Sequence, residues 1–336
     1  MKKQSKLLAL LLACAMTLAL SACGGNSATT STPAGSAAAT GDKTYTIGIC
    51  QLVQHNALDA ATKGFKDALT EKLGDKVKFD EQNAAGDSAT CATICNQFVS
   101  SNVDLIMANA TPALQAATAA TNSIPILGTS VTDYGTALSI ADWKGTTGTN
   151  VTGTADLAPL DKQAEMIKTL FPDKKNVGIL YCSAEPNSKY QSTEITKYLT
   201  DAGYTCKEYT FADSNDVAAV TKTACDESDV LYVPTDNTAA SCAESINNIA
   251  EPAKVPIVAG ESGICTGCGV ATLSIDYYDL GVVTGNMAYE VLVNGADPAT
   301  TEIQFAPKTT YQYMADRCEK LGVKVPSDYV AIEVEK

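Results

Sequence analysis

The chain has 336 residues, of which 45% are hydrophobic and 18% charged, and its formal net charge is −14. This length and hydrophobic fraction are sufficient for a large core, which we expect to be divided between two domains. The acidic balance argues against nucleic acid as a partner and against electrostatic attraction to anionic lipid head groups.

The first 22 residues have the pattern of an export signal. Three lysines precede an apolar run at 7–20, and small residues follow it, as in secretory signals. The run is short for a membrane span, which needs ~20 apolar residues. The segment LSAC at 20–23 resembles a bacterial lipobox, whose cysteine, here Cys23, receives a lipid; the alternative is an ordinary signal in which Cys23 has no role. We expect a signal peptide at 1–22 and a flexible tether, rich in small residues, at 23–43.

The segment after the tether predicts alternating strands and helices. A strand is expected at 46–50, and a helix begins near Asn56, a residue type that favours helix starts. Further strands are expected at 77–79 and 124–130, with a strand–helix unit at 103–117 between them. The helix before that unit has an apolar face that includes Cys91 and Cys95, one turn apart, which predicts core thiols.

The second half of the chain repeats this order. Strands are expected at 176–181 and 206–209, separated by a helix from 187–188 to Gly203, a residue type that ends helices. A strand–helix unit at 228–243 and a strand within 255–262 follow. Each half therefore predicts a parallel sheet covered by helices, and the whole chain an α/β protein of two similar lobes.

The loops after these strands are candidates for a ligand site, because open parallel sheets bind ligands at the carboxyl ends of their strands. They contain no lysine or arginine. An anionic group would be bound by backbone N–H groups with Thr111 and Ser130, and a cationic group by acids of these loops. A zwitterion fits this mixture. The candidate acids are Asp133, Glu185, Asp236 and Glu261. Five tyrosines are candidates for apolar walls: Tyr134, Tyr181, Tyr232, Tyr277 and Tyr278.

Catalysis is not expected from this sequence. His55 is the only histidine, and the G-x-S-x-G elbow and the P-loop are both absent, so the common nucleophile and phosphate motifs are missing. His55 is interpreted as a polar residue before a helix or as part of a cleft lining. Cys265 and Cys268 form a C-x-x-C, which leaves a local disulfide, free thiols, or a redox or metal site as alternatives.

Several segments together resemble the substrate-binding lipoproteins of ABC transporters, in the family that includes the tryptophan/tyrosine-type binding proteins. They include IGICQLVQHNALDAATKGF, DLIMANATPALQAA, IPILGTSVTD, NVTGTADL, VGILYCSAEPNSKYQ and VLYVPTDNTAAS. Family members usually have proline where this chain has Asn56, and often Asp-Pro where it has Asp133 and Tyr134. Both departures lie in cleft loops, which leaves room for a different ligand.

The resemblance implies a type I periplasmic-binding-protein fold, with two Rossmann-like lobes joined by three hinge crossings. Lobe 1 would comprise 44–154 and 275–307, and lobe 2 would comprise 155–274 and 308–336. The protein would be an extracytoplasmic monomer, anchored by the lipid on Cys23, that delivers a small ligand to an ABC permease with its ATPase. No cofactor, no metal, no nucleic acid and no enzymatic activity are expected.

The resemblance also implies the ligand contacts and favours an aromatic amino acid as ligand. The implied contacts are Gln51, Asn56, Thr111, Ser130, Asp133, Tyr181, Asn187, Ser188, Asp236, Asn237 and Glu261. We expect Asp236 to meet the ligand's ammonium, and its side chain to face an open cleft, so that removing it leaves the empty fold little changed. A sugar or nucleoside ligand, or a redox role for the C-x-x-C, are the alternatives.

Overall fold

The computed structural model describes residues 43–333. The predicted signal peptide, Cys23 and nearly all of the predicted tether lie outside these residues. Within them, none of the helices combines the length and the apolar character that crossing a membrane requires.

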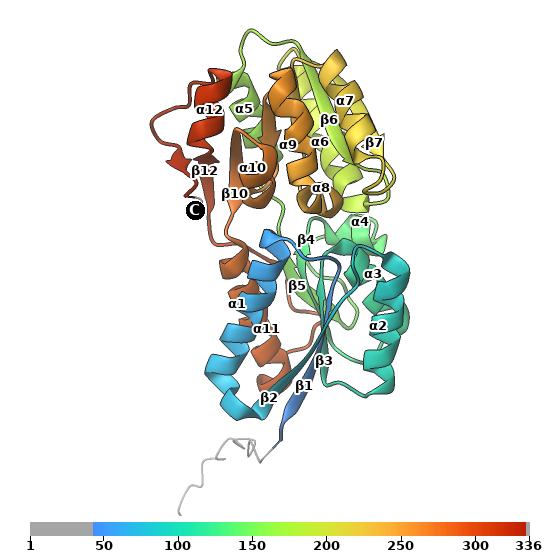
Figure 1. Ribbon diagram of the computed structural model, residues 1–336. Coiled ribbons are helices and arrows are strands. Elements are labelled where there is room, and N and C mark those ends of the chain that lie inside the picture. Colours follow the sequence, from blue (N-terminus) through green and yellow to red (C-terminus); the bar gives the residue numbers. More distant parts are fainter. Residues whose placement is uncertain (1–42, 334–336) are drawn as a thin grey trace, which may run out of the picture. The chain divides into compact units, whose positions relative to one another are not determined.

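The first sheet contains six parallel strands in the order β11-β5-β4-β3-β1-β2. Its strands are β1 (Tyr45–Gln51), β2 (Val77–Asn83), β3 (Leu105–Asn109), β4 (Ile126–Val131), β5 (Val151–Ala155) and β11 (Gln304–Phe305). The accompanying helices are α1 (Asn56–Leu73), the 3-10 turn η1 (Gly74–Lys76), α2 (Ser88–Ser100), α3 (Thr111–Ala120), α4 (Tyr134–Leu138) and α11 (Tyr277–Asn294). Helices α1 and α11 cover one face of this sheet, and α2 and α3 cover the other (Figure 1). We call this sheet and its helices the first lobe.

The second sheet contains seven strands in the order β13-β12-β10-β9-β8-β6-β7. Its strands are β6 (Asn176–Cys182), β7 (Thr205–Phe211), β8 (Val230–Val233), β9 (Ile257–Ala259), β10 (Ala271–Ile275), β12 (Thr309–Tyr313) and β13 (Val330–Ala331). The accompanying helices are α5 (Leu160–Leu170), α6 (Pro186–Asp201), α7 (Val217–Glu227), α8 (Asn237–Ser241), α9 (Ala243–Ala253), α10 (Ser262–Cys268) and α12 (Ala315–Leu321). Only the pairing of β10 with β12 is antiparallel. We call this sheet and its helices the second lobe.

The chain crosses between the two sheets three times, after β5, after β10 and between β11 and β12. The prediction of two α/β lobes with mostly parallel sheets is therefore confirmed. The predicted boundaries of the two lobes stay a prediction.

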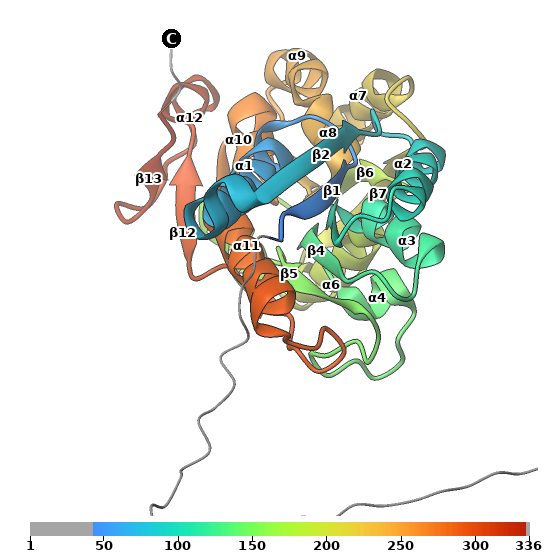
Figure 2. The same cartoon turned by 90° about the horizontal axis from the view of Figure 1, so that it is seen from below.

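The late helix α11 lies beside α1, although the two are separated by more than half the chain (Figure 2). Glycine makes this close approach possible. A Cβ on Gly64 of α1 would collide with the backbone carbonyl of Tyr278, and a Cβ on Gly281 of α11 with that of Ala61. Since only glycine lets two helix backbones come this near, the pair fixes the return of the chain to the first lobe.

Candidate functional site

Most of the predicted contact residues lie where strands of the two sheets end. Gln51 is the last residue of β1, Thr111 is the first of α3, and Ser130 is the second-to-last residue of β4. In the second lobe, Asp236 and Glu261 are the N-cap residues of α8 and α10, which directly follow β8 and β9. These positions agree with the general rule that parallel sheets present ligand groups at the carboxyl ends of their strands.

Thr111 and Ser130 offer hydroxyl groups that have no partner among the described residues. Their side chains are only 2% and 6% exposed, and neither hydroxyl makes a hydrogen bond. Both lie in strained backbone: Ala110, just before Thr111, has φ +89°, and Ser130 has φ +53°. The register between β4 and β5 also shifts at this point. Strain and unmet hydrogen bonds together are typical of a ligand site, and the adjoining N-terminus of α3 favours an anionic group.

Asp236 is held from several sides by its own lobe. Its Oδ2 accepts hydrogen bonds from the Cys182 N–H and the Ser188 hydroxyl, both at 2.7 Å, and its Oδ1 accepts from the Ala239 N–H at 2.7 Å. The side chain is 1% exposed. Burial, together with the charge of Glu185, raises the pKa of Asp236 to about 8. The expectation that this side chain faces an open cleft is therefore wrong, because it fastens α8 to the end of β6.

Glu185 is the second buried acid of this network. Its two oxygens accept hydrogen bonds from the backbone and side chains of Asn237 and Thr238, and from the Asn187 side chain, at 2.7–3.1 Å. The Asn187 Nδ2 is bonded, but its Oδ1 is buried and has no partner within the described residues. One hydrogen-bond network thus contains Glu185, Asn187, Ser188, Asp236 and Asn237. Within the described chain, the amide oxygen of Asn187 is free to accept a hydrogen bond from a ligand.

A third buried acid, Asp156, lies at the first crossing, directly after β5. Its Oδ1 accepts a hydrogen bond from the Thr132 hydroxyl at 3.1 Å, and its Oδ2 accepts one from the Tyr277 hydroxyl at 3.0 Å. Tyr277 begins α11, so the contact ties the first crossing to the second. Burial raises the pKa of Asp156 to about 6, and the charge of Glu261 adds to the effect.

Glu261 is held at the end of β9 as the cap of α10. Its carboxylate accepts hydrogen bonds from the backbone N–H groups of Gly263 and Ile264, and burial raises its pKa. The only arginine, Arg317, caps the other end of the same helix. Its guanidinium donates to the carbonyl oxygens of Cys265, Thr266, Gly267 and Gly269. The helix that carries Glu261 is thereby fixed at both ends.

Two hydrogen bonds join the lobes near these acids. The Nε2 of His55, in the loop before α1, lies 3.2 Å from the Oδ1 of Asn237. The Nε2 of Gln191, in α6, lies 3.4 Å from the Thr132 hydroxyl. Sequence reasoning left His55 between two interpretations, and its position across from Asn237 favours the cleft lining.

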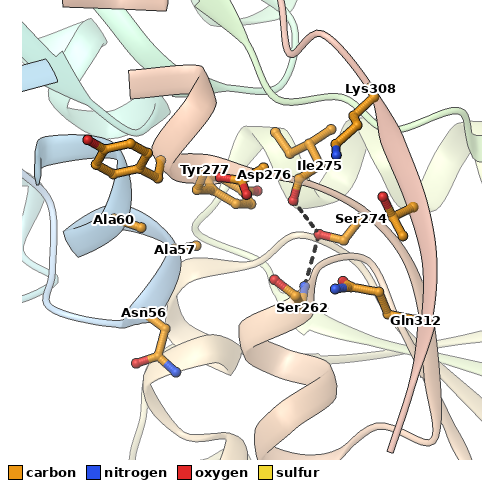
Figure 3. A pocket seen from close by; sticks show the side chains of 12 residues that line it. Asn56, Ala57, Ala60, Ser262, Ser274, Ile275, Asp276, Tyr277, Lys308 and Gln312 are labelled. Carbon is orange, nitrogen blue, oxygen red and sulfur yellow. Dashed lines mark hydrogen bonds between the residues drawn. The ribbon is translucent and has the colours of Figure 1, made fainter. Parts of the chain in front are cut away.

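The remaining predicted contacts make no hydrogen bond to the four buried acids among the described residues. Gln51 bonds within the first lobe, to Val53, Asp59 and Thr62. Asp133 caps α4 and is half-buried, and Tyr181 belongs to a hydrophobic cluster of the second lobe. Asn56 is exposed and lines a pocket of about 330 Å³ at the second and third crossings (Figure 3). There it lies with Ser262, whose N–H donates to the Ser274 hydroxyl.

The candidate aromatic walls divide into core and surface residues. Tyr134 and Tyr232 are fully buried and donate their hydroxyl hydrogen bonds to Thr154 and Gln163, respectively, so they are core residues. Tyr278 is 37% exposed. Tyr277 is the candidate wall whose hydroxyl reaches a buried acid.

The cysteines of the described range are ten free thiols. Cys91 and Cys95 are fully buried, which confirms the prediction of core thiols. Cys265 and Cys268 lie inside α10, and burial raises the pKa of Cys268 to about 12 and that of Cys265 well above its usual range. Such thiols are poor nucleophiles. Among residues 43–333, no group of three or more His, Cys, Asp or Glu side chains is arranged to hold a metal ion.

The sequence reasoning missed Asp156. The signal was present, because Asp156 follows the strand-like segment NVTGTA just as Asp236 follows VLYVPT. It was overlooked because the repeat recognised in the sequence ends with the fourth strand of each half, and β5 and its counterpart β10 both follow that strand. Its partner Tyr277 is 121 residues away in the chain, so the pair has no local pattern.

Two α/β lobes joined by three crossings, with buried polar groups at strand ends, define the architecture of a solute-binding protein. The family model of ABC transporter substrate-binding proteins matches residues 46–334, and the chain belongs to this family. Substrate-binding proteins of ABC importers are extracytoplasmic, and they bind solutes.

Three similar proteins are informative about this chain. A tyrosine-binding protein of Clostridioides difficile (strain R20291) is 40% identical over 265 residues, which cover 77% of this chain and 76% of the relative. A Streptococcus pneumonia ABC domain in complex with L-Trp has 35% identity and a TM-score of 0.81, with 85% of this chain and 97% of that chain covered. A ligand-free, open substrate-binding protein with adhesive properties from Clostridium difficile has 36% identity, a TM-score of 0.66, and coverage of 87% and 100%. At nearly equal identity, the present structure thus agrees better with the Trp-bound relative than with the open one.

Proposed function

We propose that this protein captures an aromatic amino acid outside the cytoplasm and delivers it to an ABC permease with its ATPase. The observation that carries the proposal is the pair of buried, unpartnered hydroxyls of Thr111 and Ser130, in a site that also buries carboxylates. Hydroxyls and a helix N-terminus suit the carboxylate of an amino acid, and buried acids suit its ammonium.

Two relatives support the aromatic class. One is described as a tyrosine-binding protein, and the other is in complex with L-Trp. We propose that the ligand binds between the first lobe, at 44–154 and 275–307, and the second, at 155–274 and 308–336. The proposed ligand contacts are Gln51, Asn56, Thr111, Ser130, Asp133, Tyr181, Asn187, Ser188, Asp236, Asn237 and Glu261. We also propose that the protein acts as a monomer, transforms no substrate, and is held at the membrane by a lipid on Cys23.

A thermal unfolding screen tests the ligand class. A ligand that binds only the folded state stabilises it by ~2.7 kcal/mol at a hundredfold excess over Kd. The melting temperature should rise clearly with L-tyrosine, L-tryptophan or L-phenylalanine, and should stay unchanged with glucose, ribose and adenosine. A rise with a sugar or nucleoside, and none with the three amino acids, would overturn the proposal.

A further inference from the structure

We propose that the ammonium group of the bound amino acid lies among the side chains of Asp156, Glu261 and Tyr277, beside the hinge crossings, and not at Asp236. The inference rests on the proposed function, because it assigns one end of the proposed zwitterionic ligand. It adds Asp156 and Tyr277 to the residues that determine specificity.

The four buried carboxylates within residues 43–333 differ in how many hydrogen-bond acceptor positions remain free. A carboxylate has about four lone-pair positions. Glu185 accepts five hydrogen bonds from three residues, and Asp236 accepts three, all from its own lobe. Asp156 and Glu261 accept two each. The capacity to bind further N–H groups is therefore greatest at Asp156 and Glu261.

Asp156 differs from the other three in the kind of donor that it meets. Both of its partners are hydroxyls, on Thr132 and Tyr277, whereas Glu185, Asp236 and Glu261 all accept from backbone N–H groups at helix starts. Helix capping explains those three acids as parts of the fold. Helix capping does not explain why Asp156, directly after β5, is buried to 4% exposure.

Tyr277 connects Asp156 and Glu261 in space, because its hydroxyl donates to Asp156 and it lines one pocket with Ser262, the residue after Glu261. Neither acid forms an ion pair with a lysine or arginine of the described chain. The charge of Glu261 contributes to the raised pKa of Asp156, and both charges contribute to the raised pKa of Tyr277. Half-buried His55 is the basic group that lowers the pKa of Glu261. Two buried anions without a full countercharge are costly, and a cationic ligand would offset that cost.

The geometry also suits the shape of the ligand. A primary ammonium has three N–H donors, and the two carboxylates and the Tyr277 oxygen offer three acceptors. The hydroxyls of Thr111 and Ser130, which have no hydrogen-bond partner among the described residues, lie at the start of α3 and at the end of β4. Two backbone hydrogen bonds show that these positions are neighbours. The Asp156 N–H donates to the Val131 carbonyl, next to Ser130, at 3.2 Å, and the Ala110 N–H, next to Thr111, donates to the Thr129 carbonyl at 3.0 Å. Ammonium and carboxylate of an amino acid share one carbon, so their sites must be adjacent in this way.

Calorimetric titration of the variant Asp156→Asn tests the inference. The titrants are L-tyrosine and L-tryptophan, together with 3-(4-hydroxyphenyl)propanoate and 3-(indol-3-yl)propanoate, which lack only the amino group. Removing one partner of a buried charge pair should weaken binding of the amino acid by ~100-fold or more. The wild type should bind the analogue much more weakly than the amino acid, and Asp156→Asn should not weaken binding of the analogue further.

The matched control is Asp104→Asn, the same substitution at the opposite end of the first sheet. There the Asp104 carboxylate accepts a hydrogen bond from the Thr46 N–H. It should bind as the wild type does. Glu261→Gln and Tyr277→Phe test the inference if Asp156→Asn does not fold. We expect their affinity for the amino acid to fall by ~100-fold and ~10-fold, respectively. A folded Asp156→Asn or Glu261→Gln variant that binds the amino acid within threefold of wild type overturns the inference and leaves the proposed function standing. A wild type that binds neither amino acid overturns both.

Discussion

The imidazole Nε2 of His55 lies 3.2 Å from the amide Oδ1 of Asn237, and this hydrogen bond joins the loop before α1 to the start of α8. The two residues belong to different lobes. The contact therefore exists only while the lobes lie close together, and it contributes to the arrangement in which the buried acids are covered.

We predict that His55→Ala weakens ligand binding about 3- to 10-fold, which corresponds to the ~0.5–1.5 kcal/mol of one hydrogen bond. Titration calorimetry measures the change. The variant His55→Gln keeps an N–H donor of similar reach and should recover part of the loss. An affinity of His55→Ala equal to that of the wild type would show that the contact does not help to close the lobes.

A second prediction concerns Asp236 and the stability of the fold. The substitution Asp236→Ala removes the cap of α8 and leaves the Cys182 N–H and the Ser188 hydroxyl without their acceptor. We expect the ligand-free protein to lose ~1–3 kcal/mol, or several degrees of melting temperature. Asp236→Asn keeps an acceptor oxygen for the Ala239 N–H and should lose less. An unchanged melting temperature of Asp236→Ala would contradict the capping role.

A third prediction concerns the dependence of stability and binding on pH. Burial raises the pKa of Asp156 to about 6, with Glu261, Tyr277 and Tyr134 as its titratable neighbours, whereas an unfolded aspartate titrates near ~3.9. The folded state therefore holds its proton more tightly. The contribution of Asp156 to the stability of the ligand-free protein should be fully present below the unfolded pKa and should be lost as the pH rises through 6, by on the order of 1–3 kcal/mol.

Ligand binding should show the opposite trend. An ammonium binds the ionised carboxylate, so affinity should weaken as the pH falls below 6. Melting temperatures and Kd values at pH 5, 6, 7 and 8 measure both trends. Asp156→Asn should flatten the trend in affinity and reduce the loss of stability between pH 5 and 6, whereas Asp236, whose pKa is raised to about 8, contributes a separate loss up to that pH. A ligand-free protein that becomes steadily more stable from pH 5 to pH 8 would contradict the assignment of a raised pKa.

The strand ends could be predicted from the sequence, but the directions of their side chains could not. The patterns at 46–50 and 230–233 place Gln51 and Asp236 at the edge of a parallel sheet, because the period and the turn residues are local features. The Asp236 contact with Cys182 depends on which strands are neighbours, and it spans 54 residues. The contact between Asp156 and Tyr277 depends on two crossings of the hinge. Such partners become visible only when the whole topology is known.

A fourth prediction concerns the anchor. If Cys23 receives a lipid, the protein should be found in the membrane fraction, and Cys23→Ser should move it to the soluble or secreted fraction. The acidic chain offers no electrostatic attraction to anionic lipids that would replace the anchor. Cys14→Ser, within the same predicted signal, serves as the control and should leave the protein in the membrane fraction. Unchanged membrane association of Cys23→Ser would refute the lipoprotein assignment.

Capture of an aromatic amino acid is tested most directly by calorimetric titration of the protein after bound ligand has been removed by unfolding and refolding. We predict saturable binding of one molecule per chain for L-tyrosine or L-tryptophan, and no heat of binding for glucose. Absence of binding by both amino acids in a correctly refolded protein, or saturable binding of glucose, would contradict the account.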